Sequence, residues 1–350
     1  MIKGTHMMVD NHAPPLKRLL IRMTITAALL ATAASLFACT RSEQKPAGPP
    51  EKVTIAYAIV PEAALAQVAH VKGYLLEEGV EVTPHLHPYG KLALEDVLAG
   101  KAEFATVAET PVMFAIMKGE KISIVATIQN SSTGNAIIAR KERGVLTPGD
   151  LRGKRIAATL GTVSDFFLDA ILTAHGISRK DVEVVNLKAE EMANALARGD
   201  VDAVSAFSPY TALTRKKLGA GAISFQDRDI YRFTFNVVAM QEFIRKNPEK
   251  VRRILRALVR AEDFVRENPA EAQKIVAGFS GIDIAIVRDI WPDTSFTVLL
   301  DQPLILALED ESRWAINSGL TVAEKVPNYL DFIYFDGLKS IKPDAVMILK

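Results

Sequence analysis

The chain has 350 residues, of which 49% are hydrophobic and 24% are charged, a composition typical of a globular protein with room for two domains. Its 42 basic and 41 acidic residues leave a formal net charge of +1, so charge gives no argument for nucleic-acid binding. Cys39 is the single cysteine, which excludes a disulfide framework and a cysteine-based metal cluster.

The amino terminus has the features of an export signal. A basic segment that includes Lys17 and Arg22 precedes an apolar run over residues 23–36, which is shorter than the roughly 18–20 residues of a membrane-spanning helix. The run ends in Leu36-Phe37-Ala38-Cys39, which resembles the bacterial lipoprotein signal box.

This pattern predicts a signal peptide over residues 1–38 and a lipid on Cys39 that anchors the protein to the outer face of the membrane. The proline-rich and polar residues 39–51 are then a flexible tether. An uncleaved anchor, or an ordinary secretory signal with a chance cysteine, is the alternative interpretation.

The next segment alternates between predicted strands and helices. Strands are expected at residues 53–59, from Val80, and at 103–107, 122–128 and 135–139. The first helix is expected from Pro61 to near Gly79, and a second, after a loop at Tyr89 and Gly90, through residues 92–98 to Gly100. A third helix is expected to end at Gly119, with Thr110 as its N-cap and Pro111 as its first residue. This order predicts a parallel sheet with right-handed crossovers.

Residues 150–176 then read as turn, strand, glycine loop and helix. Apolar residues recur at helical spacing from Val163, Thr162 is placed as the N-cap with Asp165 as its capping-box partner, and Gly176 ends the helix. A glycine loop that leads into a helix presents free backbone N–H groups to a small ligand. The alternative is an ordinary strand-to-helix connection.

The second half repeats the pattern of the first. Residues 182–184 resemble 80–82, and Gly199 stands where Gly100 stands in the first half. The strand at 202–206 leads into Phe207-Ser208-Pro209-Tyr210 as the strand at 103–107 leads into Ala108-Glu109-Thr110-Pro111. Two similar βαβ lobes are therefore expected, with ligand at the carboxyl ends of their strands.

The remaining chain is predicted to be mainly helical. A strand at 233–240 returns the chain to the first lobe, and helices follow at 248–267, 269–278, 283–290 and 301–317.

In this order and spacing, these motifs resemble the periplasmic solute-binding proteins of ABC importers in the nitrate, sulfonate, taurine and thiamine-pyrimidine group. The motifs are Asp150-Leu-Arg-Gly-Lys-Arg-Ile-Ala with the Gly161-Thr-Val-Ser loop, Ala195-Leu-Ala-Arg-Gly-Asp-Val-Asp-Ala203, and Phe207-Ser-Pro-Tyr210. The resemblance covers residues 52–350. It implies an α/β, two-lobed type 2 periplasmic binding protein fold, with residues 52–137 and 234–350 in one lobe, 138–233 in the other, and extended crossovers near 135–139 and 233–238.

The resemblance also implies a ligand site between the lobes, closure of the hinge around a small molecule, and recognition by an ABC permease and its ATPase. The protein is expected to act as a monomer without cofactor, metal or catalytic activity. The implied site residues are Pro61, Tyr89, Gly90, Glu109, Thr110, Gly161, Thr162, Ser164, Asp165, Phe207, Ser208 and Tyr210.

Two positions depart from the sulfonate binders that the chain resembles. Those proteins often have His where this chain has Asp165, and a Trp-Asp pair where it has Phe207 and Ser208. If Asp165 or Glu109 faces the cleft, an amine or polar heterocycle is favoured over a simple anion, although Asp165 can instead cap its own helix. An aromatic ligand could stack on Tyr89, Phe207 or Tyr210.

Two other functions stay open from the sequence. The first is a ligand sensor that acts through a separate membrane partner. The second is an enzyme, since pyrimidine-synthesising relatives share the fold, but the cysteine-rich motif that those relatives need is missing here. His85 and His87 lie two residues apart and could bind a metal, but no third ligand is apparent, so two surface histidines are the simpler interpretation.

Overall fold

Two five-stranded sheets organise the residues that this computed structural model describes, 48–349. The first sheet has the strand order β2-β1-β3-β10-β4, and the second has the order β7-β6-β8-β5-β9. The strands of the first sheet are β1 (Glu51–Ala58), β2 (Val80–His87), β3 (Phe104–Ala108), β4 (Ile122–Ser131) and β10 (Phe233–Met240); those of the second are β5 (Asn135–Arg140), β6 (Arg155–Ala158), β7 (Glu183–Asn186), β8 (Ala203–Phe207) and β9 (Ala222–Phe225).

In both sheets three parallel strands are followed by a fourth that runs antiparallel to them, and the fifth strand pairs antiparallel with the fourth. β1 pairs parallel with β2 and β3, and β6 pairs parallel with β7 and β8. β10 runs antiparallel to β3 and β4, and β5 runs antiparallel to β8 and β9. The predicted repeat of a parallel βαβ unit is therefore confirmed, and each sheet adds a strand that arrives from the other half of the chain.

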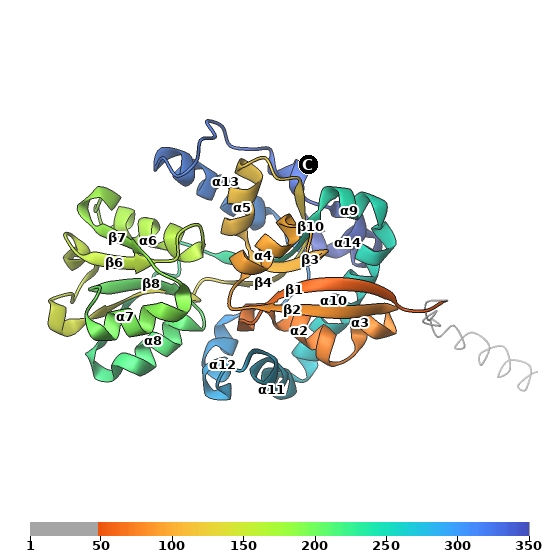
Figure 1. Ribbon diagram of the computed structural model, residues 1–350, viewed down its shortest axis with the longest axis horizontal. Coiled ribbons are helices and arrows are strands. Elements are labelled where there is room, and N and C mark those ends of the chain that lie inside the picture. The colour runs from red at the N-terminus through yellow and green to blue at the C-terminus, as the bar shows by residue number, and fades with distance from the viewer. Residues whose placement is uncertain (1–47, 350) are drawn as a thin grey trace, which may run out of the picture. The chain divides into compact units, whose positions relative to one another are not determined.

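Helices flank both sheets, and in Figure 1 α6, α7 and α8 surround the strands of the second sheet. The helices are α2 (Ala64–Val71), α3 (Tyr74–Glu77), α4 (Gly90–Leu98), α5 (Glu109–Met117), α6 (Val163–Ala174), α7 (Met192–Arg198), α8 (Tyr210–Leu218), α9 (Gln241–Lys246), α10 (Pro248–Glu267), α11 (Pro269–Ser280), α12 (Ile284–Ile290), α13 (Gln302–Asn317) and α14 (Phe335–Ile341). A two-stranded ladder joins β11 (Leu300–Asp301) to β12 (Val346–Met347). None of the helices within residues 48–349 has the length and apolar character needed to span a membrane.

Two helix predictions were wrong in detail. The predicted helix from Pro61 to Gly79 is divided into the 3-10 turn η1 (Pro61–Ala63), α2 and α3, because Gly73 adopts a left-handed φ of 76° that interrupts the helix. Thr110 is not an N-cap: Ala108 occupies that position, and the Thr110 hydroxyl donates instead to a carboxylate of Glu311, 2.8 Å away.

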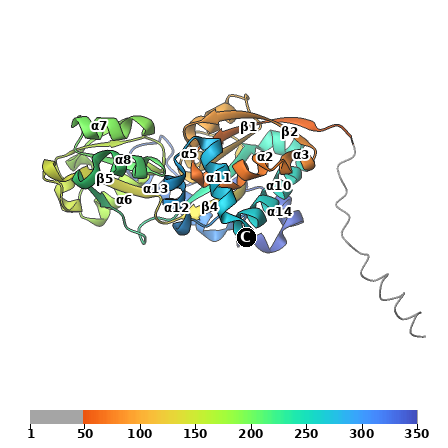
Figure 2. The same ribbon diagram turned by 90° about the horizontal axis from the view of Figure 1, so that it is seen from below.

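The first sheet forms the centre of the hydrophobic core. All ten residues of β4 and all five of β3 are buried, because helices cover both faces of these strands, as is usual for a parallel α/β sheet. Figure 2 shows α2, α10 and α11 side by side, and α10 contributes Leu255 and Leu258 to the core.

The chain passes from the first sheet to the second between β4 and β5 and returns between β9 and β10. The segments expected as crossovers, 135–139 and 233–238, are the strands that follow these two connections. Each strand is hydrogen-bonded into the sheet that the chain has just entered.

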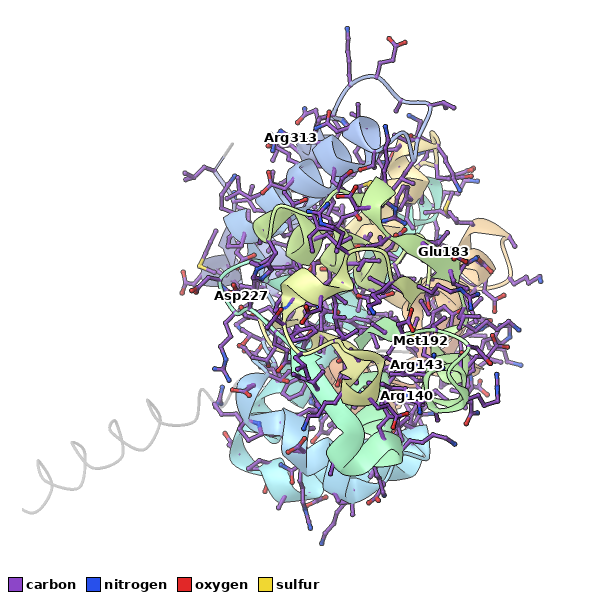
Figure 3. The ribbon with its side chains drawn as sticks, turned by 90° about the vertical axis from the view of Figure 1, so that its left-hand side faces the viewer. Arg140, Arg143, Glu183, Met192, Asp227 and Arg313 are labelled. Atoms are coloured by element: carbon purple, nitrogen blue, oxygen red, sulfur yellow. The ribbon has the colours of Figure 1, made fainter. Side chains whose placement is uncertain are left out.

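Arginine side chains fix the second sheet to α7. Arg140, at the end of β5, donates to the carbonyls of Leu196 and Ala197, and Arg143 donates to that of Gly199. Both arginine side chains lie near Gly199, and Figure 3 labels them on the second sheet's side of the molecule. Cationic groups at a helix carboxyl end satisfy its free carbonyls, so the repeated glycine at 199 marks a helix end that is held by the neighbouring strand.

Candidate functional site

A small, partly open cavity lies at the carboxyl ends of strands from both sheets. Its volume is about 30 Å³, well below that of typical small-molecule sites. The lining residues are Val60, Glu62, Tyr89, Gly90, Lys91, Ala108, Pro111, Thr162, Val163, Phe207, Ser208, Phe233 and Phe235.

Helix amino termini surround this cavity. α4 begins at Gly90 after the N-cap Tyr89, and α5 begins after the N-cap Ala108; in neither helix does the N-cap side chain accept a hydrogen bond. A Cβ on Gly90 would lie 2.7 Å from the Cα of Val107, so glycine is required for α4 to start against β3. The first turn of α4 is therefore able to donate N–H groups to a ligand, whereas in α5 the Glu109 N–H interacts with its own carboxyl and Pro111 has no N–H.

Aromatic rings form much of the wall. The rings of Tyr89 and Phe207 meet edge to face with their centroids 6.1 Å apart, and Phe207 meets Tyr210 at 5.5 Å. Tyr89 belongs to the first sheet's loops and Phe207 is the last residue of β8. The Tyr210 hydroxyl donates to the carbonyl of Pro88 at 3.2 Å. Side chains from both sheets thus close over the cavity from opposite sides.

Two buried polar side chains in the lining each have an atom without a hydrogen-bond partner. The side chain of Glu62 is 6% exposed and that of Ser208 is 1% exposed; Glu62 Oε2 and Ser208 Oγ accept or donate no hydrogen bond within residues 48–349. Burial raises the pKa of Glu62 to about 8, although its own backbone N–H and the nearby Ser208 hydroxyl oppose the shift. Unsatisfied buried polar groups are costly, so this end of the cavity is prepared for a polar ligand group.

Lys91 is the cationic side chain of the lining. Its Nζ donates to the carbonyl of Leu160 at 2.8 Å, which joins α4 to the loop before α6. Burial lowers the pKa of Lys91. Lys91 and Pro111 also line an outer hollow that includes Gly161 and Asp165, so Lys91 stands between this hollow and the cavity.

The glycine loop before α6 has the predicted cap, with one difference. Thr162 is the N-cap, and its hydroxyl accepts from the N–H of Ser164. Asp165 was expected to accept from the N–H of the N-cap residue; it accepts instead from that of Gly161, at 2.9 Å. Its other oxygen accepts from Arg179 at 2.8 Å. Both oxygens of Asp165 are therefore engaged within the protein, by the loop before the N-cap and by Arg179, rather than by the N–H groups of its own helix.

Glu109 and Thr110 belong to a buried cluster rather than to the cavity lining. Glu109 accepts from the backbone N–H of Thr234 at 2.9 Å and from the hydroxyl of Tyr231, which also contacts Glu311. Burial raises the pKa of Glu109 to about 7 and raises that of Glu311 well above its usual range. Because a phenol has one proton to donate, the second carboxyl contact requires a protonated carboxyl.

Of the predicted site residues, the structure brings Tyr89, Gly90, Thr162, Phe207 and Ser208 together in the cavity lining. Pro61 and Ser164 adjoin lining residues in the chain, and Tyr210 contacts the lining residue Phe207 through its ring, but none of the three belongs to the lining itself. Ser164 is fully buried, and its Oγ accepts from the N–H of Thr159.

Sequence reasoning missed four lining residues that shape the chemistry: Glu62, Lys91, Phe233 and Phe235. Glu62 and Lys91 directly follow the predicted Pro61 and Gly90. A charged residue in the first turn after a strand was the available indication for both. The two phenylalanines lie on β10, which no local pattern connects to the loops.

The histidine pair is explained by a neighbouring carboxylate. His85 Nδ1 and His87 Nε2 each lie 2.9 Å from Oδ2 of Asp96, and the two histidines lower the pKa of Asp96 against the effect of its partial burial. Within residues 48–349, no group of three or more His, Cys, Asp or Glu side chains has an arrangement that could hold a metal ion.

The predicted lipidation site, Cys39, lies outside the described residues.

Comparison with known proteins identifies relatives across most of the chain. The model of the NMT1/THI5 like family matches residues 61–272. A protein of Bacillus subtilis (strain 168) named as an aliphatic sulfonates-binding protein is 25% identical over 272 residues, which cover 75% of this chain and 82% of the relative.

Two solved structures share the fold. The periplasmic aliphatic sulphonate binding protein SsuA from Escherichia coli superposes with a TM-score of 0.69 at 19% identity, covering 81% of this chain and 98% of SsuA. The desulfurization enzyme DSZB superposes with a TM-score of 0.64 at 16% identity, covering 82% of this chain and 98% of DSZB. The predicted periplasmic binding protein fold is therefore confirmed, and it is a fold that binding proteins and an enzyme share.

Proposed function

The chain belongs to the NMT1/THI5 like family, and from this premise we propose that it is the extracytoplasmic substrate-binding component of an ABC importer. The observation that carries the proposal is the cavity that strand ends of both sheets build, in which Glu62 and Ser208 have polar atoms without partners. A cavity lined from both sheets suits a ligand that binds between two lobes.

The proposed ligand is a small organic solute. The cavity measures only about 30 Å³ in this arrangement and has an aromatic wall, so a solute needs the lobes to part before it enters. The lining favours a compact molecule with an apolar part and a few polar groups. A relative and a structural neighbour are named for binding aliphatic sulfonates, which supports a sulfonate or taurine-like solute; an amine-bearing or pyrimidine-like solute is the other candidate class.

The two lobes of the proposed transport cycle are residues 52–137 with 234–350, and residues 138–233. Ligand closes them because it contacts both in the closed state, and a permease with its ATPase then receives the closed form. Contacts such as that of Lys91 with the Leu160 carbonyl support a closed arrangement. We further propose that the protein works as a monomer, and that a lipid on Cys39 holds it at the outer face of the membrane.

Binding is favoured over catalysis by the content of the cavity. Its lining offers one carboxyl, one ammonium and two hydroxyl side chains, besides the Tyr89 phenol, and includes neither cysteine nor histidine among the described residues. No cofactor is part of the proposal. A sensor that reports to a membrane receptor would have the same cavity, so uptake assays in cells distinguish it from an importer subunit.

A thermal-shift screen tests the proposal. The purified protein is incubated with sulfonates, taurine, nitrate, pyrimidines, aromatic acids and amines, and a ligand at about 100 times its Kd adds about 2.7 kcal/mol. Phe207→Ala removes an aromatic wall and should abolish the shift, whereas Leu86→Ala, at a side chain 52% exposed on β2, should leave it unchanged. If no solute in the panel stabilises the wild-type protein, the binding function is refuted. If a bound solute is converted to a product, an enzymatic function is favoured instead.

A further inference from the structure

The polar end of the cavity is built from both halves of the molecule. Glu62 lies in η1, directly after β1 of the first sheet, and Ser208 directly follows β8 of the second. Their orphan atoms, Glu62 Oε2 and Ser208 Oγ, are both able to accept a hydrogen bond. A ligand group that contacts both would therefore join the two sheets.

The buried Glu62 carboxyl keeps one oxygen, Oε2, without a hydrogen-bond partner. In its ionised form the carboxyl regains its lost solvation best from a cationic donor, through charge-assisted hydrogen bonds. An acidic ligand group could pair only with the protonated form of Glu62, so the two ligand classes require opposite protonation states of this carboxyl. No arginine belongs to the lining, all of which lies within residues 48–349, and the ammonium of Lys91 already donates to Leu160.

The aromatic wall favours the same ligand chemistry. Tyr89, Phe207 and Phe233 line the cavity together with Glu62, and a Cβ on Gly134 would lie 2.6 Å from the Phe233 ring and 3.8 Å from Glu62 Oε1, so ring and carboxyl are neighbours. The faces of aromatic rings attract ammonium groups, most strongly when water is excluded. Carboxyl and rings together form an environment suited to an ammonium group.

We propose that Glu62 and Ser208 bind a protonated amine of the ligand, so that the protein selects amine-bearing solutes over amine-free sulfonates and nitrate. This inference rests on the proposed solute-binding function and narrows it to one ligand class. The first turn of α4, whose N-cap side chain accepts no hydrogen bond, leaves the rest of the cavity able to receive an acidic group, so a zwitterion such as an aminosulfonate is also compatible with the site.

Proton release accompanies this binding. Glu62 is largely protonated at neutral pH in the empty cavity, since burial raises its pKa to about 8. When a cationic amine enters, the carboxyl gives its proton to solvent and pairs with the amine as a carboxylate. Binding of an amine should therefore tighten as pH rises from 6 to 8, whereas binding of an anion should weaken over the same range.

Calorimetry with matched ligand pairs tests the inference. Taurine is compared with ethanesulfonate, and 2-phenylethylamine with 2-phenylethanol, in two buffers of different ionisation enthalpy at pH 7. We expect at least one amine to bind at least tenfold more tightly than its amine-free partner, with release of a proton. Glu62→Gln should remove that preference, whereas Glu81→Gln, at an exposed carboxylate on β2, should preserve it.

The possible failures are distinguishable. If amine-free compounds bind as tightly as amines, or if Glu62→Gln keeps the preference for amines, the role of Glu62 is refuted while the solute-binding function stands. If neither these pairs nor the broader panel of solutes binds to the wild-type protein, the solute-binding function is refuted and the inference fails with it.

Discussion

Replacing Glu62 with glutamine should change how the stability of the ligand-free protein depends on pH. The pKa of Glu62 rises from its usual value of 4.5 to about 8 on burial. Between these values the folded state keeps a proton that the unfolded state has lost, so the stability of the folded state falls as pH increases. A shift from 4.5 to about 8 corresponds to roughly 5 kcal/mol at about 1.4 kcal/mol per unit, an upper limit because local relaxation and water entry reduce it.

The assay is denaturant unfolding at pH 5, 6, 7 and 8 of the wild-type protein, Glu62→Gln and the exposed control Glu81→Gln. Glutamine has nearly the shape of the protonated carboxyl and does not ionise, so the stability gain of Glu62→Gln over wild type should grow by about 1 kcal/mol per pH unit up to pH 8. Comparing the two proteins at each pH removes the contributions of the other buried carboxyls, which both share. A difference between Glu62→Gln and wild type that is independent of pH would refute the burial argument.

Three further substitutions test other parts of the site. Lys91→Ala removes the hydrogen bond to the loop before α6 and should increase the radius of gyration of the ligand-free protein in small-angle scattering; an unchanged radius would contradict a closing role. Tyr231→Phe removes the hydroxyl shared by Glu109 and Glu311 and should cost about 1–3 kcal/mol in urea unfolding, more at pH 8 than at pH 6 because the pKa of Glu109 lies at about 7 and its ionised form needs the donor most. An equal cost at both pH values would contradict that assignment. Gly90→Ala places a Cβ against the backbone of β3 and should cost about 1–3 kcal/mol and weaken ligand binding; full stability would show that α4 can shift.

Local patterns in the chain were enough to predict most elements and the fold class. The stretch from residue 150 to 176 combines apolar residues at helical spacing, a threonine at the N-cap and a terminating glycine, and these signals depend only on near neighbours along the chain. They predicted β6, Thr162 as N-cap and the end of α6 before Gly176. Tyr89, Gly90, Phe207 and Ser208 were found as cavity residues for the same reason, because they directly follow strands or begin helices.

The role of each carboxyl depended on partners that are distant in the chain. Asp165 is engaged by Arg179, and Glu109 accepts from Thr234, which is 125 residues away. Neither pairing follows from local patterns, because Arg179 lies beyond the end of α6 and Thr234 lies on β10, a strand that returns from the second sheet. Whether a carboxyl is buried without a partner is a property of the assembled packing, and for that reason only the tertiary structure could assign the free carboxyl of the cavity to Glu62 rather than to Asp165 or Glu109.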